Sequence, residues 1–313
     1  MNGSNNKLVR FDTQTGDWDY KSISEKLSFN DFGSIGIEVH APIIDSDGDG
    51  VPDEEDEYPN DPNRAFKSYY PGENTFGSLA FEDLWPAKGD YDFNDLVLRY
   101  QLHNILNANN KVVSIEASFY VKHIGAAFEN GFGISFDFPS SKVASVDGCR
   151  LTDGYITLNG NNTEEGHNNA VIVVFDNANT QLYETLNITI TLTEPISDTE
   201  IGAFPYNPFL IIDKNRDYEV HLPDVGPTQL ADINIFGSIN DDSKPTENRY
   251  YKSQNNLPWA IDIPVDFVYP IEKVEIIKGY KKFADWASSG GTVYEDWYLD
   301  NDGYRDEQFL DFN

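Results

Sequence analysis

The chain contains a single cysteine, Cys149, among its 313 residues. One thiol excludes an intrachain disulfide and any zinc site built from several cysteines. The fold must therefore be held by burial of apolar side chains, with help from metal ions where acidic residues cluster. No catalytic motif surrounds Cys149, and we expect it to be a small, buried apolar side chain.

Basic residues are also scarce. Lys and Arg number 22 against 53 Asp and Glu, which gives a formal net charge of −31 at pH 7. Such a surface repels nucleic acid phosphates and anionic membranes, so the sequence predicts no nucleic-acid partner and suits a cation-binding or extracellular protein. The five histidines show no spacing typical of a zinc site, and we expect them on strand surfaces. They are His40, His103, His123, His167 and His221.

Long apolar runs are absent. No stretch approaches the roughly 20 apolar residues of a transmembrane helix, and "MNGSNNKLVR" at the start does not read as a signal peptide. If the protein is exported, we expect its signal peptide and any lipid anchor to lie outside this sequence. The sequence also has no phosphate-binding glycine loop, nucleophile elbow or zinc-protease motif, and we expect no enzymatic activity.

What the sequence does contain is an alternation of apolar and polar residues, which predicts half-buried strands at 113–121, 132–138 and 186–192. The uninterrupted apolar run "AVIVVF" (170–175) predicts a central strand buried on both faces. Turns rich in Gly, Asn and Asp separate these segments. The pattern indicates an all-β fold, an antiparallel β-sandwich of jelly-roll type.

One segment has helical spacing instead. Tyr280, Phe283 and Ala287 lie at i, i+3 and i+7, and two glycines follow at 290–291 as a stop signal. These residues predict a short amphipathic helix over about 280–288 that packs on the sandwich.

The segment "DSDGDGVPDEED" (45–56) has the spacing of a calcium loop. Positions 1, 3, 5, 9 and 12 are filled by Asp45, Asp47, Asp49, Asp53 and Asp56, with Gly50 at position 6 and the carbonyl of Val51 at position 7. Calcium takes 6–8 oxygen ligands, whereas soft metals prefer the His and Cys that this loop lacks. Pro52 and the prolines that follow exclude the flanking helices of an EF-hand. We expect bound Ca2+ in a structural role.

A second acidic group lies in "FEDLWPAKGDYDFND" (81–95). Its oxygen-bearing side chains are Glu82, Asp83, Asp90, Asp92, Asn94 and Asp95. They form either a second hard-cation site or a set of turn caps. Strand alternation places Asp95 on the face opposite to Asp90, Asp92 and Asn94, so a metal site requires a turn or bulge here.

The stretch "LAFEDLWPAKGDYDFNDLVLRY" (79–100) resembles the signature of the LruC-type domain of bacterial surface proteins and lipoproteins. The acidic loop before it is similar to a single thrombospondin type 3 calcium repeat, and residues 255–298 resemble the end of an LruC-type domain. The resemblance covers about 45–306. It implies an exported, envelope-associated protein of a Bacteroidota type and no established reaction.

These features predict three segments: a short N-terminal β segment (1–44), the calcium loop (45–66) and an LruC-like β-sandwich (67–313). The Pro-rich stretch 203–211 is where the sandwich would subdivide, near residue 200.

The favoured function is an exported, cell-surface, calcium-binding module for adhesion or for binding a protein or glycan ligand. One alternative is a calcium-dependent carbohydrate-binding protein with an exposed aromatic strip that includes Trp259, Trp286 and Trp297. The other is a glycan-active hydrolase whose two acidic residues face each other in a cleft.

Overall fold

The computed structural model describes residues 7–11, 18–22 and 44–312. The chain forms two compact units, residues 1–43 and residues 44–313. In the first unit, strand β1 (Lys7–Phe11) pairs antiparallel with β2 (Trp18–Ser22). The rest of the predicted N-terminal β segment, with His40, lies outside the described residues.

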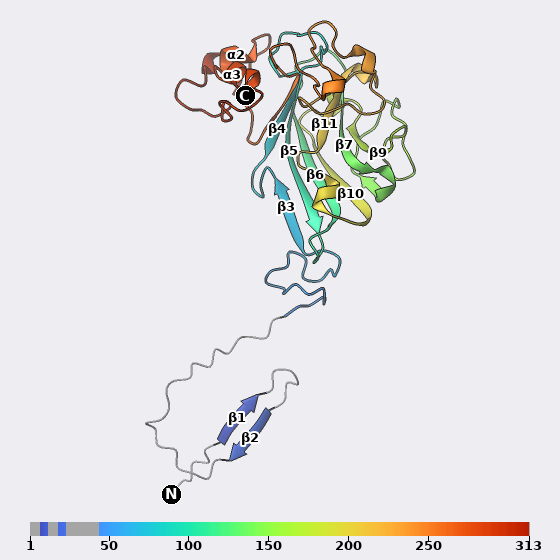
Figure 1. The fold of residues 1–313 in the computed structure, drawn as a ribbon, viewed down its shortest axis with the longest axis vertical. Coiled ribbons are helices and arrows are strands. Elements are labelled where there is room, and N and C mark those ends of the chain that lie inside the picture. Colours follow the sequence, from blue (N-terminus) through green and yellow to red (C-terminus); the bar gives the residue numbers. More distant parts are fainter. Residues whose placement is uncertain (1–6, 12–17, 23–43, 313) are drawn as a thin grey trace. The chain divides into compact units, whose positions relative to one another are not determined.

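The second unit contains two antiparallel sheets (Figure 1). The larger sheet has the order β13-β4-β5-β6-β10-β8, and β3 pairs with β5 beside β4. Its strands are β3 (Phe66–Tyr70), β4 (Gly77–Phe81), β5 (Leu96–Leu106), β6 (Val112–His123), β8 (Val143–Asp147), β10 (Thr185–Ile196) and β13 (Ala260–Ile263). The three longest strands, β5, β6 and β10, are consecutive neighbours in this sheet.

The smaller sheet has the order β12-β11-β7-β9. Its strands are β7 (Gly131–Pro139), β9 (Asn169–Phe175), β11 (Asn207–Ile211) and β12 (Glu219–His221). The connection between β10 and β11 carries the chain from the larger sheet to the smaller one, and the Pro-rich stretch 203–211 covers the end of this connection and β11.

The predicted all-β, antiparallel sandwich is confirmed, and strands cover all four predicted segments. The expectation of a central position for 170–175 is wrong, because β9 ends the order of its sheet. Its outer face is nevertheless buried, since Leu151, Tyr155 and Ile156 from a neighbouring loop pack over Val171 and Val173. An apolar run indicates a strand that is buried on both faces. A loop that covers the second face can bury it as well as another sheet layer can.

The core lies between the two sheets, where alternate residues of each strand point inward. Phe119 of the larger sheet contacts Phe132 of the smaller one edge-on, with ring centroids 5.2 Å apart. Both side chains are fully buried. The period-two pattern therefore positions the layers, and the buried aromatic rings fill the space between them.

The C-terminal segment covers part of the outer face of the larger sheet. Helices α2 (Ile276–Gly279) and α3 (Phe283–Ser288) lie beside β4 in Figure 1, and Phe283 and Trp297 pack in one cluster with Val97 of β5. The helix predicted over 280–288 begins only at Phe283. Tyr280 is extended, and its hydroxyl donates to the Val268 carbonyl at 2.7 Å.

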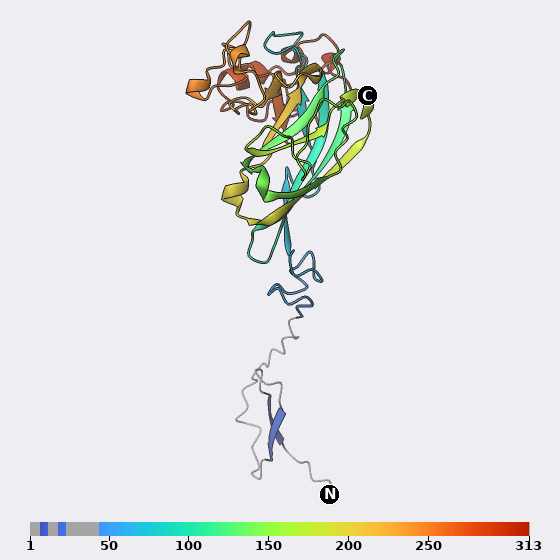
Figure 2. The same ribbon diagram turned by 90° about the vertical axis from the view of Figure 1, so that its right-hand side faces the viewer.

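The remaining helical elements are single turns. They are α1 (Asp198–Ile201), η1 (Ser140–Lys142), η2 (Ala178–Thr180), η3 (Ile212–Lys214), η4 (Ile233–Ile235), η5 (Pro245–Glu247) and η6 (Glu307–Phe309). Figure 2 shows the orange and red C-terminal third gathered at one end of the sheets. None of the helices in the described part of the chain has the length and apolarity needed to cross a membrane.

Candidate metal centre

The acidic loop lies directly before β3, at the Leu106 end of β5. The Ala65 amide donates to the Leu106 carbonyl at 2.7 Å, and the Glu57 amide donates to Ala65. Gly48 and Gly50 have φ values of +80° and +98°, which glycine adopts without steric cost. These glycines let the chain turn on either side of Asp49.

The first three aspartates of the loop converge. Carboxylate oxygens of Asp45, Asp47 and Asp49 lie within 4.8 Å of one another. Backbone amides hold them in place: Gly48 and Gly50 donate to Asp45 at 2.7 and 3.1 Å, and Val51 donates to Asp49 at 2.8 Å. The amides thus fix the carboxylates without introducing a positive side chain.

Three carboxylate oxygens of the loop are buried and have no hydrogen-bond partner among the described residues: Oδ2 of Asp47, of Asp49 and of Asp56. Asp56 is only 8% exposed, and its other oxygen accepts from the Tyr58 amide at 2.6 Å. Desolvation first, and then the negative charges of Asp49, Asp56 and Asp45, raise the pKa of Asp47. The negative charge of Asp56 therefore reaches Asp47. Burying a hydrogen-bond acceptor without a partner costs free energy unless a ligand satisfies it.

Asp53 has a different place from the other predicted ligands. Its two oxygens accept from the amide and the hydroxyl of Ser46, both at 2.7 Å, and its amide donates to the Ile44 carbonyl. Through these hydrogen bonds, Asp53 holds the loop closed. The side chain of Val51 is buried, and its amide is the one bonded to Asp49.

The second acidic group lies at the opposite end of β5, before Leu96. Of its six members, the structure brings Glu82, Asp90 and Asp92 within 4.8 Å of one another. The Tyr91 and Phe93 amides donate to Glu82 at 3.1 and 2.5 Å. Both residues have positive φ, 62° and 55°, and this is the local turn that a metal site requires here.

Asp92 and Asn94 tie this turn to the C-terminal segment. Asp92 accepts from the Lys273 amide at 2.7 Å, and Asn94 donates to the Pro270 carbonyl at 3.3 Å. The Asn94 Oδ1 atom is buried without a partner. Burial raises the pKa of Asp92 to about 6 and that of Glu82 well above its ordinary value.

Asp83 and Asp95 form a separate contact. The Asp83 amide donates to Asp95 at 2.8 Å, and the Asp83 carboxylate accepts from Asn130 at 2.8 Å. Burial and then the charge of Asp83 raise the pKa of Asp95 to about 8. Within the described residues, no Lys or Arg forms an ion pair with any acid of the second group.

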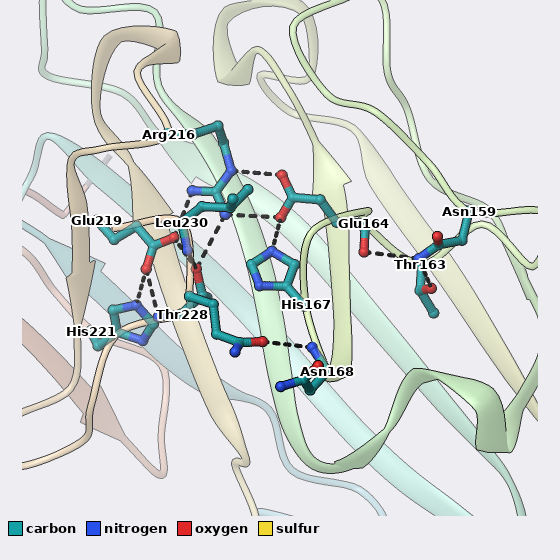
Figure 3. Close-up of polar contacts among 11 residues, drawn as sticks. Asn159, Thr163, Glu164, His167, Asn168, Arg216, Glu219, His221, Thr228 and Leu230 are labelled. Carbon is teal, nitrogen blue, oxygen red and sulfur yellow. Dashed lines mark hydrogen bonds and ion pairs between the residues drawn. The ribbon is translucent and has the colours of Figure 1, made fainter. Parts of the chain in front are cut away.

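A buried ionic network lies in the smaller sheet and the loops beside it (Figure 3). Arg216 contacts Glu164 at 2.7 and 2.8 Å and Glu219 at 2.7 Å. His167 lies 3.0 Å from Glu164, and His221 lies 2.9 Å from Glu219. We refer to these five residues as the Arg216 network.

The expectation of strand-surface histidines is wrong for His167 and His221, whose side chains are buried. Burial alone would raise the pKa of Glu219, but His221 and Arg216 outweigh burial and lower it to about 2. Sequence reasoning missed this network because Glu164 and Arg216 are 52 positions apart. The local signals are the i, i+2 pair of Glu219 and His221 in β12 and two i, i+3 pairs, Glu164 with His167 and Arg216 with Glu219.

Residues 110–298 match the family model described as "Domain of unknown function (DUF4842)". The chain belongs to the DUF4842 family. No curated protein matches it. Among solved structures, the chain is similar to a "Putative lipoprotein" from Bacteroides ovatus, with 17% identity, a TM-score of 0.55, and coverage of 78% of this chain and 76% of that chain. The likeness to that structure shows a shared fold.

The DUF4842 match contains the Arg216 network and the C-terminal helices, whereas both acidic groups precede it. Trp259 and Trp297, inside the matched region, are buried, and Trp286 is half-buried against Trp297. These tryptophans therefore do not form an exposed strip. Cys149, also in this region, packs against the core, and burial raises its pKa to about 11, so it remains a thiol.

Proposed function

We propose that this DUF4842 protein is an exported, cell-surface, non-enzymatic module that binds calcium in its 45–56 loop and serves adhesion or ligand binding. The observation that carries the proposal is the set of buried, unpartnered oxygens on Asp47, Asp49 and Asp56. They lie in a segment whose spacing matches a calcium loop.

Calcium fits these residues better than other common metals. The loop offers only oxygen, which disfavours zinc and copper, and it offers many protein ligands, whereas magnesium retains several waters. A divalent cation would satisfy the three unpartnered oxygens and offset the repulsion among neighbouring aspartates. The proposed ligands are Asp45, Asp47, Asp49, Asp56 and the Val51 carbonyl. Asp53 holds the loop closed through its hydrogen bonds to Ser46.

The role we propose for the ion is structural. The loop is bonded to the end of β5 through Ala65, so an ion that fixes the loop also fixes the entry of the chain into the sandwich. The resemblance to LruC-type domains and the similarity to a protein named as a lipoprotein support the cell-surface location. Labelling of intact cells with a membrane-impermeant reagent tests that location, and labelling only after lysis would contradict it.

Calcium titration by calorimetry tests the metal site. We expect a dissociation constant on the order of 10⁻⁴–10⁻³ M, the range of weak extracellular calcium modules. The double variant Asp47→Asn/Asp49→Asn should lose this binding. Glu54→Gln/Glu55→Gln removes the same charge from exposed positions of the same loop and should retain it. Wild-type protein that binds no calcium in this range would refute the proposal.

The Glu82, Asp90 and Asp92 group is the proposed second cation site. Its support is the close approach of three carboxylates with no ion pair to any of them in the described residues. The same titration measures it by stoichiometry. Two ions in the wild type, and one in either Asp47→Asn/Asp49→Asn or Asp90→Asn, are expected. A single ion that Asp90→Asn leaves unchanged would restrict the metal to the loop.

A further inference from the structure

A cavity of about 590 Å³ lies at the end of the sandwich where β4 ends, the end opposite to the acidic loop. Its walls come from segments far apart in the sequence: residues 83–86, Phe128, Ile212, Asp213, Asn215, Tyr218, Asn234, Ile235, Ser238 and Ile239. This volume falls within the range of small-ligand and peptide side-chain sites.

The most exposed apolar residues of the cavity lining are aliphatic. Leu84 is 45% exposed and Ile239 is 76% exposed, and both line the cavity together with Ile212 and Ile235. Single exposed apolar residues are ordinary, but several around one hollow mark an interaction site.

Ile239 is held in an unfavourable backbone conformation. Its φ is +55°, a left-handed value that is rare for a β-branched residue. The neighbouring backbone is bonded on both sides: Asn240 donates to the Pro86 carbonyl at 3.2 Å, and Asp241 donates to Ser238 at 2.9 Å. Strain that the surroundings maintain is typical of ligand-contacting segments.

The charge of the cavity is negative. Asp83 and Asp213 line it, and no Lys, Arg or His does. Asn130 connects the two acids, because its amide group donates to the Asp83 carboxylate at 2.8 Å and accepts from the Asp213 backbone at 3.1 Å. The Asp213 carboxylate accepts from the Glu129 amide, and no ion pair to it occurs among the described residues.

These features select one class of ligand. Sugar rings favour exposed aromatic faces, but Trp85 is 2% exposed and the other two aromatic residues of the lining, Phe128 and Tyr218, are half-buried. Two fixed carboxylates beside aliphatic side chains match a cationic group on an aliphatic chain, next to apolar neighbours. We propose that this cavity binds a lysine-bearing, aliphatic peptide segment of a partner protein. The proposal deepens the ligand-binding part of the proposed function and rests on it.

Calorimetry of the full chain in calcium buffer tests the cavity with two blocked peptides, acetyl-Gly-Leu-Lys-Leu-Gly-amide and the same peptide with Gln in place of Lys. We expect the Lys peptide to bind at least tenfold more tightly, with a preference that shrinks in 0.5 M salt because charges are screened. Equal binding, or no binding of either peptide, would overturn the proposal. Tighter binding of cellotetraose would overturn it in favour of a glycan site.

Variants test whether the peptide binds in this cavity. Asp213→Asn should reduce affinity for the Lys peptide at least fivefold and leave the Gln peptide unchanged, and Ile239→Gly should weaken both while relieving the left-handed strain. Asp217→Asn and Ile233→Ala, exposed nearby but outside the cavity, are the matched controls and should bind as the wild type does.

Calcium binding is measured on the same samples. Loss of peptide preference with normal calcium binding refutes the cavity site alone. Absent calcium binding with normal peptide preference refutes only the calcium proposal.

Discussion

Replacing Arg216 with Met should destabilise the sandwich strongly. Three nitrogen–oxygen contacts of 2.7 to 2.8 Å join Arg216 to Glu164 and Glu219, whose side chains are 2% and 0% exposed. Removing the cation leaves two buried carboxylates with only a histidine each as a basic neighbour. Breaking a buried ion pair in this way costs about 3–5 kcal/mol. For a domain of this size, the melting temperature should fall by roughly 10 °C.

Urea unfolding followed by circular dichroism measures this loss, with Lys214→Gln as the control. Lys214 contacts Glu129 and Asp153 at 2.6 and 2.7 Å, but these side chains are partly exposed, so its loss should have little effect on stability. Adding Glu164→Gln and Glu219→Gln to Arg216→Met should recover part of the stability, because the uncompensated charges are gone. If Arg216→Met costs no more than Lys214→Gln, the reasoning on this network is wrong.

Three further predictions concern acid, metal and core packing. Because the folded pKa of Glu219, about 2, lies below its ordinary 4.5, its stabilising contribution is complete above about pH 4.5 and is lost as pH falls toward 2. Glu219→Gln should make the free energy of unfolding depend less on pH over that range. An unchanged pH profile would count against the lowered pKa of Glu219. Calcium at 100 times the dissociation constant of the loop should raise the free energy of unfolding by about 2.7 kcal/mol, and a chelator should reverse this in the wild type. In Asp47→Asn/Asp49→Asn this contribution of the loop should be absent, and a wild-type melting temperature that the chelator leaves unchanged would refute the structural-ion proposal. Phe132→Ala should cost about 3–5 kcal/mol in urea unfolding, since this buried ring joins both sheets, and a loss below 1 kcal/mol would show that the core collapses around the gap.

The sequence predicts strands such as β6 and β10 well because burial there repeats at every second residue. It does not predict which strand ends a sheet, as β9 shows, because loop residues such as Tyr155 cover apolar side chains too. It also predicts the helix too early, since Tyr280 has the right spacing but lies in the extended link before α3.

The candidate sites also differ in how far the sequence predicts them. The residues of the 45–56 loop are local, so their spacing alone brings Asp45, Asp47 and Asp49 together. The approach of Glu82 to Asp90 and Asp92 depends on left-handed backbone at Tyr91 and Phe93, which the residue types do not favour. The Arg216 network and the cavity at Ile239 are assembled from distant segments, and only the folded chain brings them together.

The pairing of β5 with its neighbours has a geometric consequence. The acidic loop adjoins Leu106 and the cavity lies near Leu96, so the 11-residue strand acts as a spacer of about 34 Å between them. A ligand in the cavity would therefore not contact an ion in the loop.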